Sequence, residues 1–425
     1  MKSLVPRVLR DEPQFARLFA GQSLSVLGDR VAFVAMPFAV LSVGGSASDV
    51  GLVAAAGLVP MLLFTLAGGV WADRFPRHRI MLASDLVRFV VQGLIAVLLL
   101  TGVAGVAHLA VLTAVFGSAD AFFMPASTGL IPLVVGSDRL RQANALRGLA
   151  QSSALVLGPA VAGGLVALAG PGGALALDAL TFAVSAGFLV RLKPRGTGYP
   201  ARAAEEGTFL AELRAGWVHV RSRTWVWSGM AAMAVYHVVV LPAVFVLGPV
   251  LAEHEWAGAA GWSTVVAAFG VGSVVGDLCA YRLRTARPMA VAAAALAVAA
   301  SQALVIGSGG SLAMVAVLEA VTGVAVSVFF VLWETALQTH VPEHALSRVS
   351  SYDYLLSSGL MPLGLALAGP VSQALGMRPT LYAMTAVAVP AALALLCVPS
   401  VRHLPARAVA PGGDDAPAEP AVIRP

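Results

Sequence analysis

Charged residues are scarce in this chain of 425 residues. Asp, Glu, Lys and Arg together make up 12% of it, and 58% of its residues are hydrophobic. Soluble domains carry about 25% charged residues. The mean hydropathy of +0.85 is also far above that of a soluble domain. This composition leaves no room for a large water-soluble domain.

Cysteine and the common cofactor motifs are also rare or missing. The only two cysteines, Cys279 and Cys397, lie far apart in apolar runs, so we expect packing roles and neither a metal nor a redox site. No Gly-Lys-Ser/Thr phosphate loop occurs, which argues against ATP-driven chemistry by this chain. The glycines at 270, 272 and 276 follow no strand, and Pro342 interrupts the only closely spaced histidine pair. We therefore expect no cofactor and no metal.

What the sequence has instead is long apolar runs. A helix that spans a membrane needs about 20 apolar residues. Twelve runs qualify, which predicts an all-α membrane protein with twelve transmembrane helices. The runs cover about 17–43, 48–71, 79–101, 106–135, 143–169, 172–192, 224–251, 260–282, 287–308, 311–339, 346–375 and 378–400. The first run carries Asp29 and Arg30 and leads into eleven more, which is not the pattern of a cleaved signal peptide.

Basic residues occupy alternate gaps between these runs. Of the 27 Lys and Arg residues, all but Arg30, Arg88 and Arg378 lie in one set of gaps, together with the two termini. Loops rich in Lys and Arg stay in the cytoplasm. The pattern therefore predicts a multi-pass protein of the plasma membrane with both termini in the cytoplasm. Because the positive charge is spread along a membrane surface, the net charge of +5 does not indicate nucleic-acid binding.

The longest polar gap divides six spans from six. We expect an N-terminal bundle over residues 1–192, a cytoplasmic linker with an amphipathic helix over 193–223, a C-terminal bundle over 224–401 and a disordered tail over 402–425. The pair Phe122-Phe123 precedes Arg141 at the same separation as Phe329-Phe330 precedes Arg348. Two pseudo-twofold bundles of this kind are typical of transporters whose halves rock about a central site.

The gap after the second span carries a recognisable motif. Gly69, Asp73, Arg74, Arg77 and Arg79 stand in the spacing Gly-x-x-x-Asp-Arg-x-x-Arg-x-Arg. This resembles the signature of the major facilitator superfamily. The resemblance implies a loop that gates the conformational cycle, with the acid against a helix N-terminus of the opposite half. The alternative is an ordinary basic loop. The equivalent gap near Gly276 and Arg282 lacks the acid, so any lock there should be weaker.

The fifth span contains a second motif. Gly158, Pro159, Gly163 and Gly164 resemble the Gly-Pro-x-x-x-Gly-Gly element of proton-coupled antiporters in the same superfamily. Proline removes a helix hydrogen bond and bends the helix, and glycines allow helices to pack closely. Packing alone could also explain these residues.

Further stretches resemble one branch of that superfamily. The segments 21–29, 123–126, 143–146 and 348–351 are similar to those of enterobactin exporters and macrolide-efflux proteins. The resemblance covers nearly the whole transmembrane part and implies the major facilitator fold. One departure concerns the fourth span, where many drug–proton antiporters carry an arginine. Here the charge is Asp120, so coupling through such an arginine cannot be assumed.

A charged residue inside the membrane is expected to have a functional or structural role, because each charge costs about 2.5–3.5 kcal/mol at the bilayer centre. Asp29 and Arg30 lie near the middle of the first span and point in different directions, so each should meet its own partner. We expect Asp120 to pair with Arg30, either for coupling or as a structural ion pair. Asp29 is the expected proton site, since a carboxylate removed from water takes up a proton more readily. Asp85 and Arg88, one turn apart, are expected to be structural.

The resemblance implies that the first, fourth, seventh and tenth spans line a cavity. In the tenth span five residues share one helical face: Glu319, Gly323, Ser327, Phe330 and Glu334. Glu319 and Glu334 are candidates for the proton or substrate site, although Glu334 stands near the end of its span, where it could simply be hydrated. Tyr236 and His237 are candidates in the seventh span, where a packing role for the histidine is the alternative.

These observations predict a secondary active transporter. We expect it to be a proton-coupled antiporter that exports amphipathic small molecules, such as antibiotics or siderophores, by alternating access. Its partners would be a small-molecule substrate, protons and the lipid bilayer, and we expect a monomer. The alternatives are an importer of a small metabolite and, in another class, a membrane enzyme or sensor. An enzyme would need a nucleophile with its base, or metal ligands, at one interface, and the sequence shows neither.

Overall fold

The computed structural model describes residues 6–195 and 217–406, without the side chains of 66–70, 72, 73, 343, 344 and 347. Within these ranges every regular element is a helix. The first half of the chain forms α1 (Arg7–Asp11), α2 (Pro13–Ser42), α3 (Ala47–Arg74), α4 (Arg77–Leu100), α5 (Val106–Val134), η1 (Ser137–Arg139) and α6 (Leu140–Val190). Of these helices, α6 is long enough to cross a membrane twice.

Glycine and proline divide α6 into two spans. Gly170 has a positive φ of 68°, and Pro171 follows it. A positive φ costs glycine little, and proline supplies no N–H for the preceding turn. The helix therefore turns back at this point. The described residues contain 11 segments that are long and apolar enough to span a membrane, and the segment Ser137–Val190 holds two of the twelve predicted spans.

The second half of the chain contains more interrupted helices. Its elements are α8 (Thr224–Val235), η2 (Tyr236–Val240), η3 (Ala243–Leu247), α9 (Gly248–Glu255), α10 (Ala259–Arg282), α11 (Pro288–Ala299), α12 (Gln302–Gly307), α13 (Leu312–His340), α14 (Glu343–Ser358), α15 (Met361–Leu375), α16 (Met377–Ala394), η4 (Leu395–Cys397) and α17 (Pro399–Arg402). Elements η2 and η3 are π-helical turns inside the seventh span. Such wider turns occur often at functional sites.

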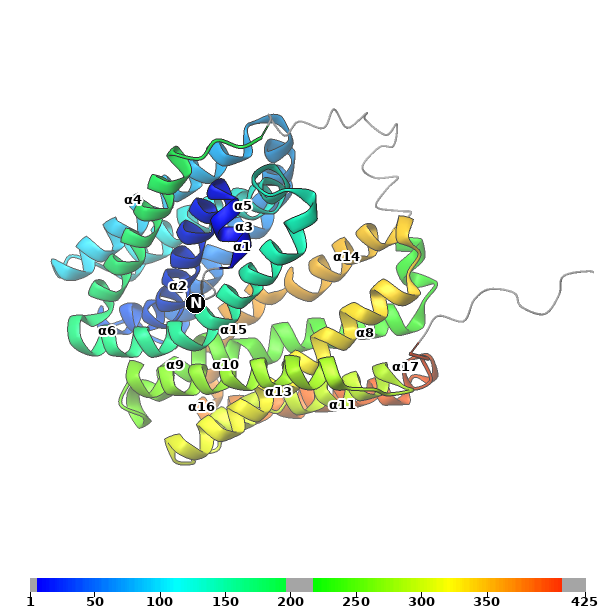
Figure 1. The fold of residues 1–425 in the computed structure, drawn as a ribbon. Helices are drawn as coiled ribbons and strands as arrows, with labels where there is room; N and C mark the ends of the chain where they lie inside the picture. The colour runs from blue at the N-terminus through cyan, green and yellow to red at the C-terminus, as the bar shows by residue number, and fades with distance from the viewer. Residues whose placement is uncertain (1–5, 196–216, 407–425) are drawn as a thin grey trace, which may run out of the picture.

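The helices form two bundles that lie side by side (Figure 1). In the first, α2 and α4 pack on α6, and α3 packs on α5. In the second, α10 and α11 pack on α13. The predicted all-α membrane fold with twelve spans in two bundles is confirmed. The predicted linker helix lies partly outside the described residues: 217–221 are helical, and 208–216 are not described. The predicted tail beyond 406 also lies outside them.

The two bundles touch mainly through two helix pairs, α6 with α10 and α3 with α15. Glycines make these contacts close. A Cβ on Gly51 would collide with the backbone of Leu365, and one on Gly163 would collide with Ser263. Small residues allow membrane helices to approach in this way. Small residues therefore let the two bundles pack closely at these helix pairs.

The apolar core shows at which end the bundles meet. One cluster of buried side chains includes residues of both halves, among them Val34, Val246 and Leu365. Two other clusters each belong to one half, one around Phe15 and Leu130 and one around Trp333. The shared cluster lies toward the ends of α2 and α9 and the start of α3. The halves are therefore joined at that end and packed separately at the other.

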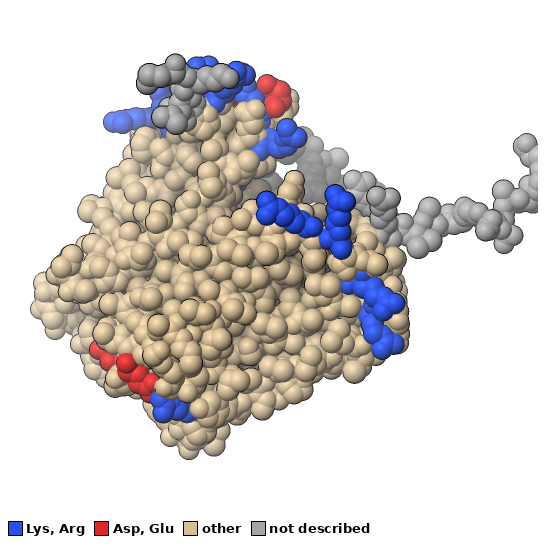
Figure 2. Space-filling view, turned by 60° about the horizontal axis from the view of Figure 1, so that its bottom comes forward, with Lys and Arg blue, Asp and Glu red and all other residues tan. Residues whose placement is uncertain are grey.

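The end where the halves separate is the basic one. Figure 2 shows Lys and Arg side chains along the upper and right side of the molecule, and a smaller group of acidic and basic side chains at the lower left. Polar contacts tie the basic loops of the first half together, because Glu12 accepts a hydrogen bond from Arg195 (2.7 Å) and another from the backbone N–H of Gly136 (3.2 Å). At the opposite end Arg378 pairs with Glu255 at 2.9 Å. We call these the basic end and the acidic end.

Candidate functional site

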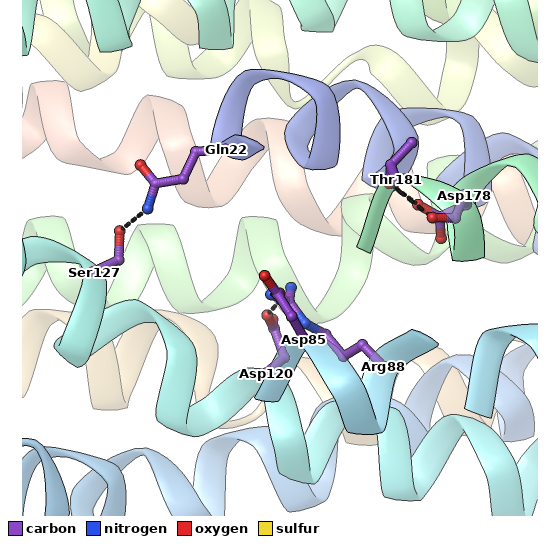
Figure 3. Close-up of polar contacts among 7 residues, drawn as sticks. All are labelled: Gln22, Asp85, Arg88, Asp120, Ser127, Asp178 and Thr181. Carbon is purple, nitrogen blue, oxygen red and sulfur yellow. Dashed lines mark hydrogen bonds and ion pairs between the residues drawn. The ribbon is translucent and has the colours of Figure 1, made fainter. Parts of the chain in front are cut away.

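A buried arginine links two helices of the first half. The guanidinium of Arg88 in α4 donates to Asp120 of α5 at 3.1 Å and also to Asp85, one turn earlier in α4. The side chain of Arg88 is 2% exposed and that of Asp85 is 0% exposed, whereas Asp120 is 27% exposed. The guanidinium also lies over the rings of Phe123 and Phe182, at 4.1 and 4.5 Å. Figure 3 shows these three charged residues meeting between α4 and α5.

This geometry corrects one prediction. Asp120 pairs with Arg88 and not with Arg30. Arg30 forms no ion pair with any residue that the structure describes; its Cβ lies where a Cβ on Gly158 of α6 would be. The pairing of Asp85 with Arg88 along one helix is as expected, but the additional contact with Asp120 was not foreseen. A sequence does not fix how far each helix is rotated about its axis.

Asp29 faces the same group of charges. It lines a cavity of about 140 Å³ together with Arg88, Asp120, Gln22 and Arg147. Gln22 donates to Ser127 at 2.6 Å in the wall of this cavity. Among the described residues Asp29 has neither a hydrogen bond nor an ion pair.

A second acid of the first half is enclosed. Asp178 of α6 accepts a hydrogen bond from Gln92 of α4 at 2.8 Å, and Thr181 lies beside it in the same helix, as Figure 3 shows. A Cβ on Gly28 would collide with both Asp178 and Thr181. Asp178 is 0% exposed and does not line the cavity of Asp29. Asp178 thus joins α6 to α4 through a buried hydrogen bond.

The antiporter-like motif lies where α6 meets its neighbours. Gly158 contacts Arg30 of α2, Gly163 contacts Ser263 of the other bundle, and a Cβ on Gly164 would meet nothing within 4 Å. Pro159 is buried beside Gly158. Two of the three glycines are thus required for close packing, one within the first bundle and one between the bundles.

The predicted gating loop joins α3 to α4 at the basic end. Gly69 and Asp73 lie in α3, and their surroundings are outside the described side chains. Arg77 donates to the backbone carbonyl of Gly129 in α5, which fixes the start of α4 to its own bundle. Arg74 and Arg79 are exposed.

A larger cavity lies in the second half. It has a volume of about 350 Å³ and is walled by α13, α14 and the seventh span. Of the five residues predicted to share one face of the tenth span, Phe330 and Glu334 line it, and His237 joins them from η2. The Nδ1 atom of His237 lies 2.8 Å from the carbonyl oxygen of Met233 in its own helix.

Glu319, Tyr236 and the remaining residues of that face lie elsewhere. Glu319 is 1% exposed and accepts hydrogen bonds from Gln302 and Thr322, both at 2.8 Å. The hydroxyl of Tyr236 donates to Gln302 at 3.1 Å. Gly323 packs against α10, and Ser327 donates to Asp277 there. The expectation that all five residues point into one cavity is therefore wrong. Glu319 belongs to a buried network inside the second bundle.

The sequence reasoning missed an acid in the wall of the larger cavity. Asp353 of α14 accepts hydrogen bonds from Trp333 at 3.1 Å and from Ser357 at 3.3 Å, and Tyr354 lies beside it. Trp333 is itself buried against Phe329, with the ring centroids 6.2 Å apart. The signal was available, because Asp353 is a charge inside an apolar run, as Asp29 is. It was overlooked because the start of this run is polar.

The chemical groups of the site are concentrated in two cavities. Two cavities, one in each half, contain carboxyl groups, an imidazole and aromatic rings. In the described part of the chain no three His, Cys, Asp or Glu residues are placed to hold a metal ion.

Comparison with known proteins gives the family. The family model described as transmembrane secretion effector matches residues 8–419. The multidrug efflux pump Tap of Mycobacterium tuberculosis is 29% identical over 409 residues, which are 92% of this chain and 94% of that protein. Macrolide efflux protein A of Streptococcus pyogenes is 25% identical over 167 residues, or 39% of this chain and 41% of that one.

Solved structures agree on the fold. A bacterial homologue of the iron transporter ferroportin, in an inward-facing state, superposes with a TM-score of 0.71 at 16% identity, over 91% of this chain and 98% of that one. The family model spans nearly all the transmembrane part, and the members of this superfamily are transporters rather than enzymes. The chain belongs to the transmembrane secretion effector family of the major facilitator superfamily and is a multi-pass membrane transporter.

Proposed function

We propose that this protein is a proton-coupled antiporter that exports amphipathic small molecules by alternating access. The observation that carries the proposal is Asp29, an unpaired carboxyl group in the same cavity as the Arg88–Asp120 ion pair. Three acids (Asp29, Asp85 and Asp120) compete for the single guanidinium of Arg88. Protonation of one of them would relieve the excess negative charge. Asp29 is the one that no described residue already holds.

The coupling follows from this competition. When Asp29 is charged, it attracts Arg88 and weakens the hold of Arg88 on Asp120. When Asp29 is protonated, the Arg88–Asp120 pair is left undisturbed. Because an ion pair in a low-dielectric cavity is sensitive to nearby charge, the proton state of Asp29 would bias the packing of α2 against α4 and α5. Because α2, α4 and α5 belong to the first bundle, this change in packing would accompany the movement of that bundle during the transport cycle.

The substrate class follows from the second cavity. Glu334 and Asp353 have no ion pair with any residue in the described ranges, and Phe330 and Tyr354 lie beside them. Acidic and aromatic side chains together favour cations with an apolar body, although neutral compounds would also fit. The names of the relatives, a multidrug efflux pump and a macrolide efflux protein, favour export and antibiotics over siderophores.

Orientation and gating complete the proposal. The basic end would face the cytoplasm, with both termini there and the protein in the plasma membrane. The halves are joined at the acidic end, so this conformation would be open to the cytoplasm. Asp73 and the arginines around it would hold the halves together at the basic end when the cavity opens outward. We expect the monomer to be the working unit.

Transport by inside-out membrane vesicles tests the proposal. Vesicles from cells that produce the protein should accumulate a cationic dye when a proton gradient is imposed, and vesicles with Asp29→Asn should not. Uptake by right-side-out vesicles alone would indicate an importer. Accumulation that persists after the proton gradient is collapsed would overturn proton coupling.

A further inference from the structure

A groove on the outside of the first bundle is not explained by transport. It lies between α3, α4 and α5 and has a volume of about 440 Å³. Apolar side chains form its walls: Trp71, Phe75, Ile80, Ala83, Val87, Val115, Ala119 and Phe122. Trp71 is 52% exposed and Phe75 is 51% exposed. These exposed rings lie at the basic end of a membrane protein, so the groove faces lipid.

One cation stands at the end of this groove. Arg79, in the first turn of α4, lines the groove and is exposed. Among the residues that the structure describes, it has neither an ion pair nor a hydrogen bond. The groove extends from Arg79 to Val87, eight residues along α4, or about 12 Å at 1.5 Å per residue. The groove thus has the exposed Arg79 at the membrane surface and apolar walls along the rest of its length.

We propose that this groove binds an anionic phospholipid. The phosphate would lie on Arg79, where an arginine can donate two hydrogen bonds to one phosphate group. One acyl chain would lie along α4 against the wall that Trp71 and Phe122 form, where the two rings contact each other edge to face with their centroids 5.4 Å apart. Basic pockets on the cytoplasmic side of membrane helices bind such headgroups. Charge complementarity selects the anionic lipid over a zwitterionic one.

The groove lies on the outer side of α4 and α5, close to the Arg88–Asp120 ion pair. Ser84 and Val87 line it, and their chain neighbours Asp85 and Arg88 form the buried pair on the other side of α4. Ala119 likewise precedes Asp120 in α5. A lipid between these helices therefore touches the same turns that carry Arg88 and Asp120. We infer that its presence supports the packing of α4 on α5, on which the Arg88–Asp120 contact depends.

Lipid retention by the purified full-length protein tests this proposal without any transport measurement. The protein in detergent is incubated with phosphatidylglycerol or phosphatidylcholine, and bound lipid is counted by native mass spectrometry. The wild type should retain more phosphatidylglycerol. Arg79→Gln should lose this preference, and Ala83→Trp, which fills the groove, should lose bound lipid of both kinds. Arg79→Lys should keep most of the preference, because it keeps the charge.

Two matched controls separate the site from general effects. Arg141→Gln removes another exposed arginine of the basic end, and Val90→Trp enlarges an exposed side chain of α4 that does not line the groove. Both should retain phosphatidylglycerol as the wild type does. Thermal unfolding and size-exclusion profiles check that each variant is folded. If the wild type shows no preference for phosphatidylglycerol, or if Arg79→Gln behaves like Arg141→Gln, the proposal fails.

A further outcome would also overturn the proposal. If Ala83→Trp keeps its phosphatidylglycerol but loses binding of a cationic dye, the groove admits substrate instead of lipid. Failure of the transport proposal would leave the lipid measurement unaffected, since retention is measured without a gradient.

Discussion

Arg88 of α4 and Asp120 of α5 form an ion pair of 3.1 Å that joins two helices inside the membrane part of the first bundle. The same guanidinium also binds Asp85 and lies over two aromatic rings. Arg88 is almost completely buried, and its Nη atoms donate to Asp85 and Asp120, so its charge is balanced mainly by these two carboxylates. The contact therefore connects the packing of the bundle to the charges in the cavity of Asp29.

Removing the arginine should destabilise the protein. Arg88→Gln leaves Asp85 and Asp120 without their cation, and the loss of one partner from a buried pair costs about 3–5 kcal/mol. Thermal unfolding in detergent measures the effect. The double variant Arg88→Gln with Asp120→Asn should recover part of the loss, because it leaves one fewer unpaired carboxylate. A single variant as stable as the wild type would show that the pair is not a structural element.

The glycines of the antiporter-like motif should differ in their tolerance of alanine. A Cβ on Gly158 would occupy the position of the Arg30 side chain, whereas a Cβ on Gly164 would meet nothing. Overpacking of this kind costs about 1–3 kcal/mol. Gly158→Ala should therefore lower the unfolding temperature and the transport rate, and Gly164→Ala should leave both unchanged. Equal effects of the two substitutions would contradict the packing seen here.

Asp353 should contribute to the binding of cations. Asp353→Asn removes a charge whose contact with a bound cation is worth about 1.5–3 kcal/mol, or roughly 10- to 150-fold in affinity. Fluorescence titration with a cationic and a neutral dye should show a loss for the cationic dye alone. Trp333→Phe removes the hydrogen bond that orients the carboxylate and should cause a smaller loss of the same kind.

The control for Asp353 is a remote acid. Glu253→Gln, at the acidic end, should leave the affinity for both dyes unchanged. If Asp353→Asn weakens the neutral dye as much as the cationic one, the carboxylate has a structural role and not a recognition role.

The loops after the second and eighth spans should lie on the same side of the membrane. Single cysteines at Arg74 and Arg282, in a variant without Cys279 and Cys397, can be labelled with an impermeant maleimide. Neither should react in intact cells and both should react in inside-out vesicles, since basic loops remain in the cytoplasm. Labelling of one loop from each side would contradict the arrangement of spans.

The fold could be predicted from the sequence because the membrane restricts which structures a chain can form when it spans the bilayer. The length of the apolar runs predicted the number of spans, the alternation of the basic gaps predicted their orientation, and the longest polar gap divided them into two sets of six. The boundary predicted between the runs 143–169 and 172–192 falls at Gly170 and Pro171, where the structure turns. These features depend on composition along the chain and not on contacts between helices.

The site was harder to predict because it depends on contacts between helices. Asp120 was assigned to Arg30 because both are charges inside spans, but the rotation of α4 brings Arg88 to it instead. Glu319 was placed in a cavity by its helical face, yet α12 covers that part of the face and Gln302 binds the carboxylate. Asp29 was chosen for its position alone. The structure brings it to Arg88 and Asp120, and its role in coupling remains a prediction.

Transport by the purified protein under a pH difference tests the central claim most directly. Proteoliposomes that contain the wild-type protein, with an acidic lumen, should accumulate a cationic dye, and the flux should stop when the pH difference is removed. A pH difference equivalent to 100 mV supplies about 2.3 kcal/mol per proton, which at one proton per dye molecule corresponds to roughly a 50-fold accumulation. Asp29→Asn should abolish this accumulation, whereas Glu253→Gln should not. Accumulation that is unchanged in Asp29→Asn, or wild-type protein that moves no dye under any pH difference, would contradict the account.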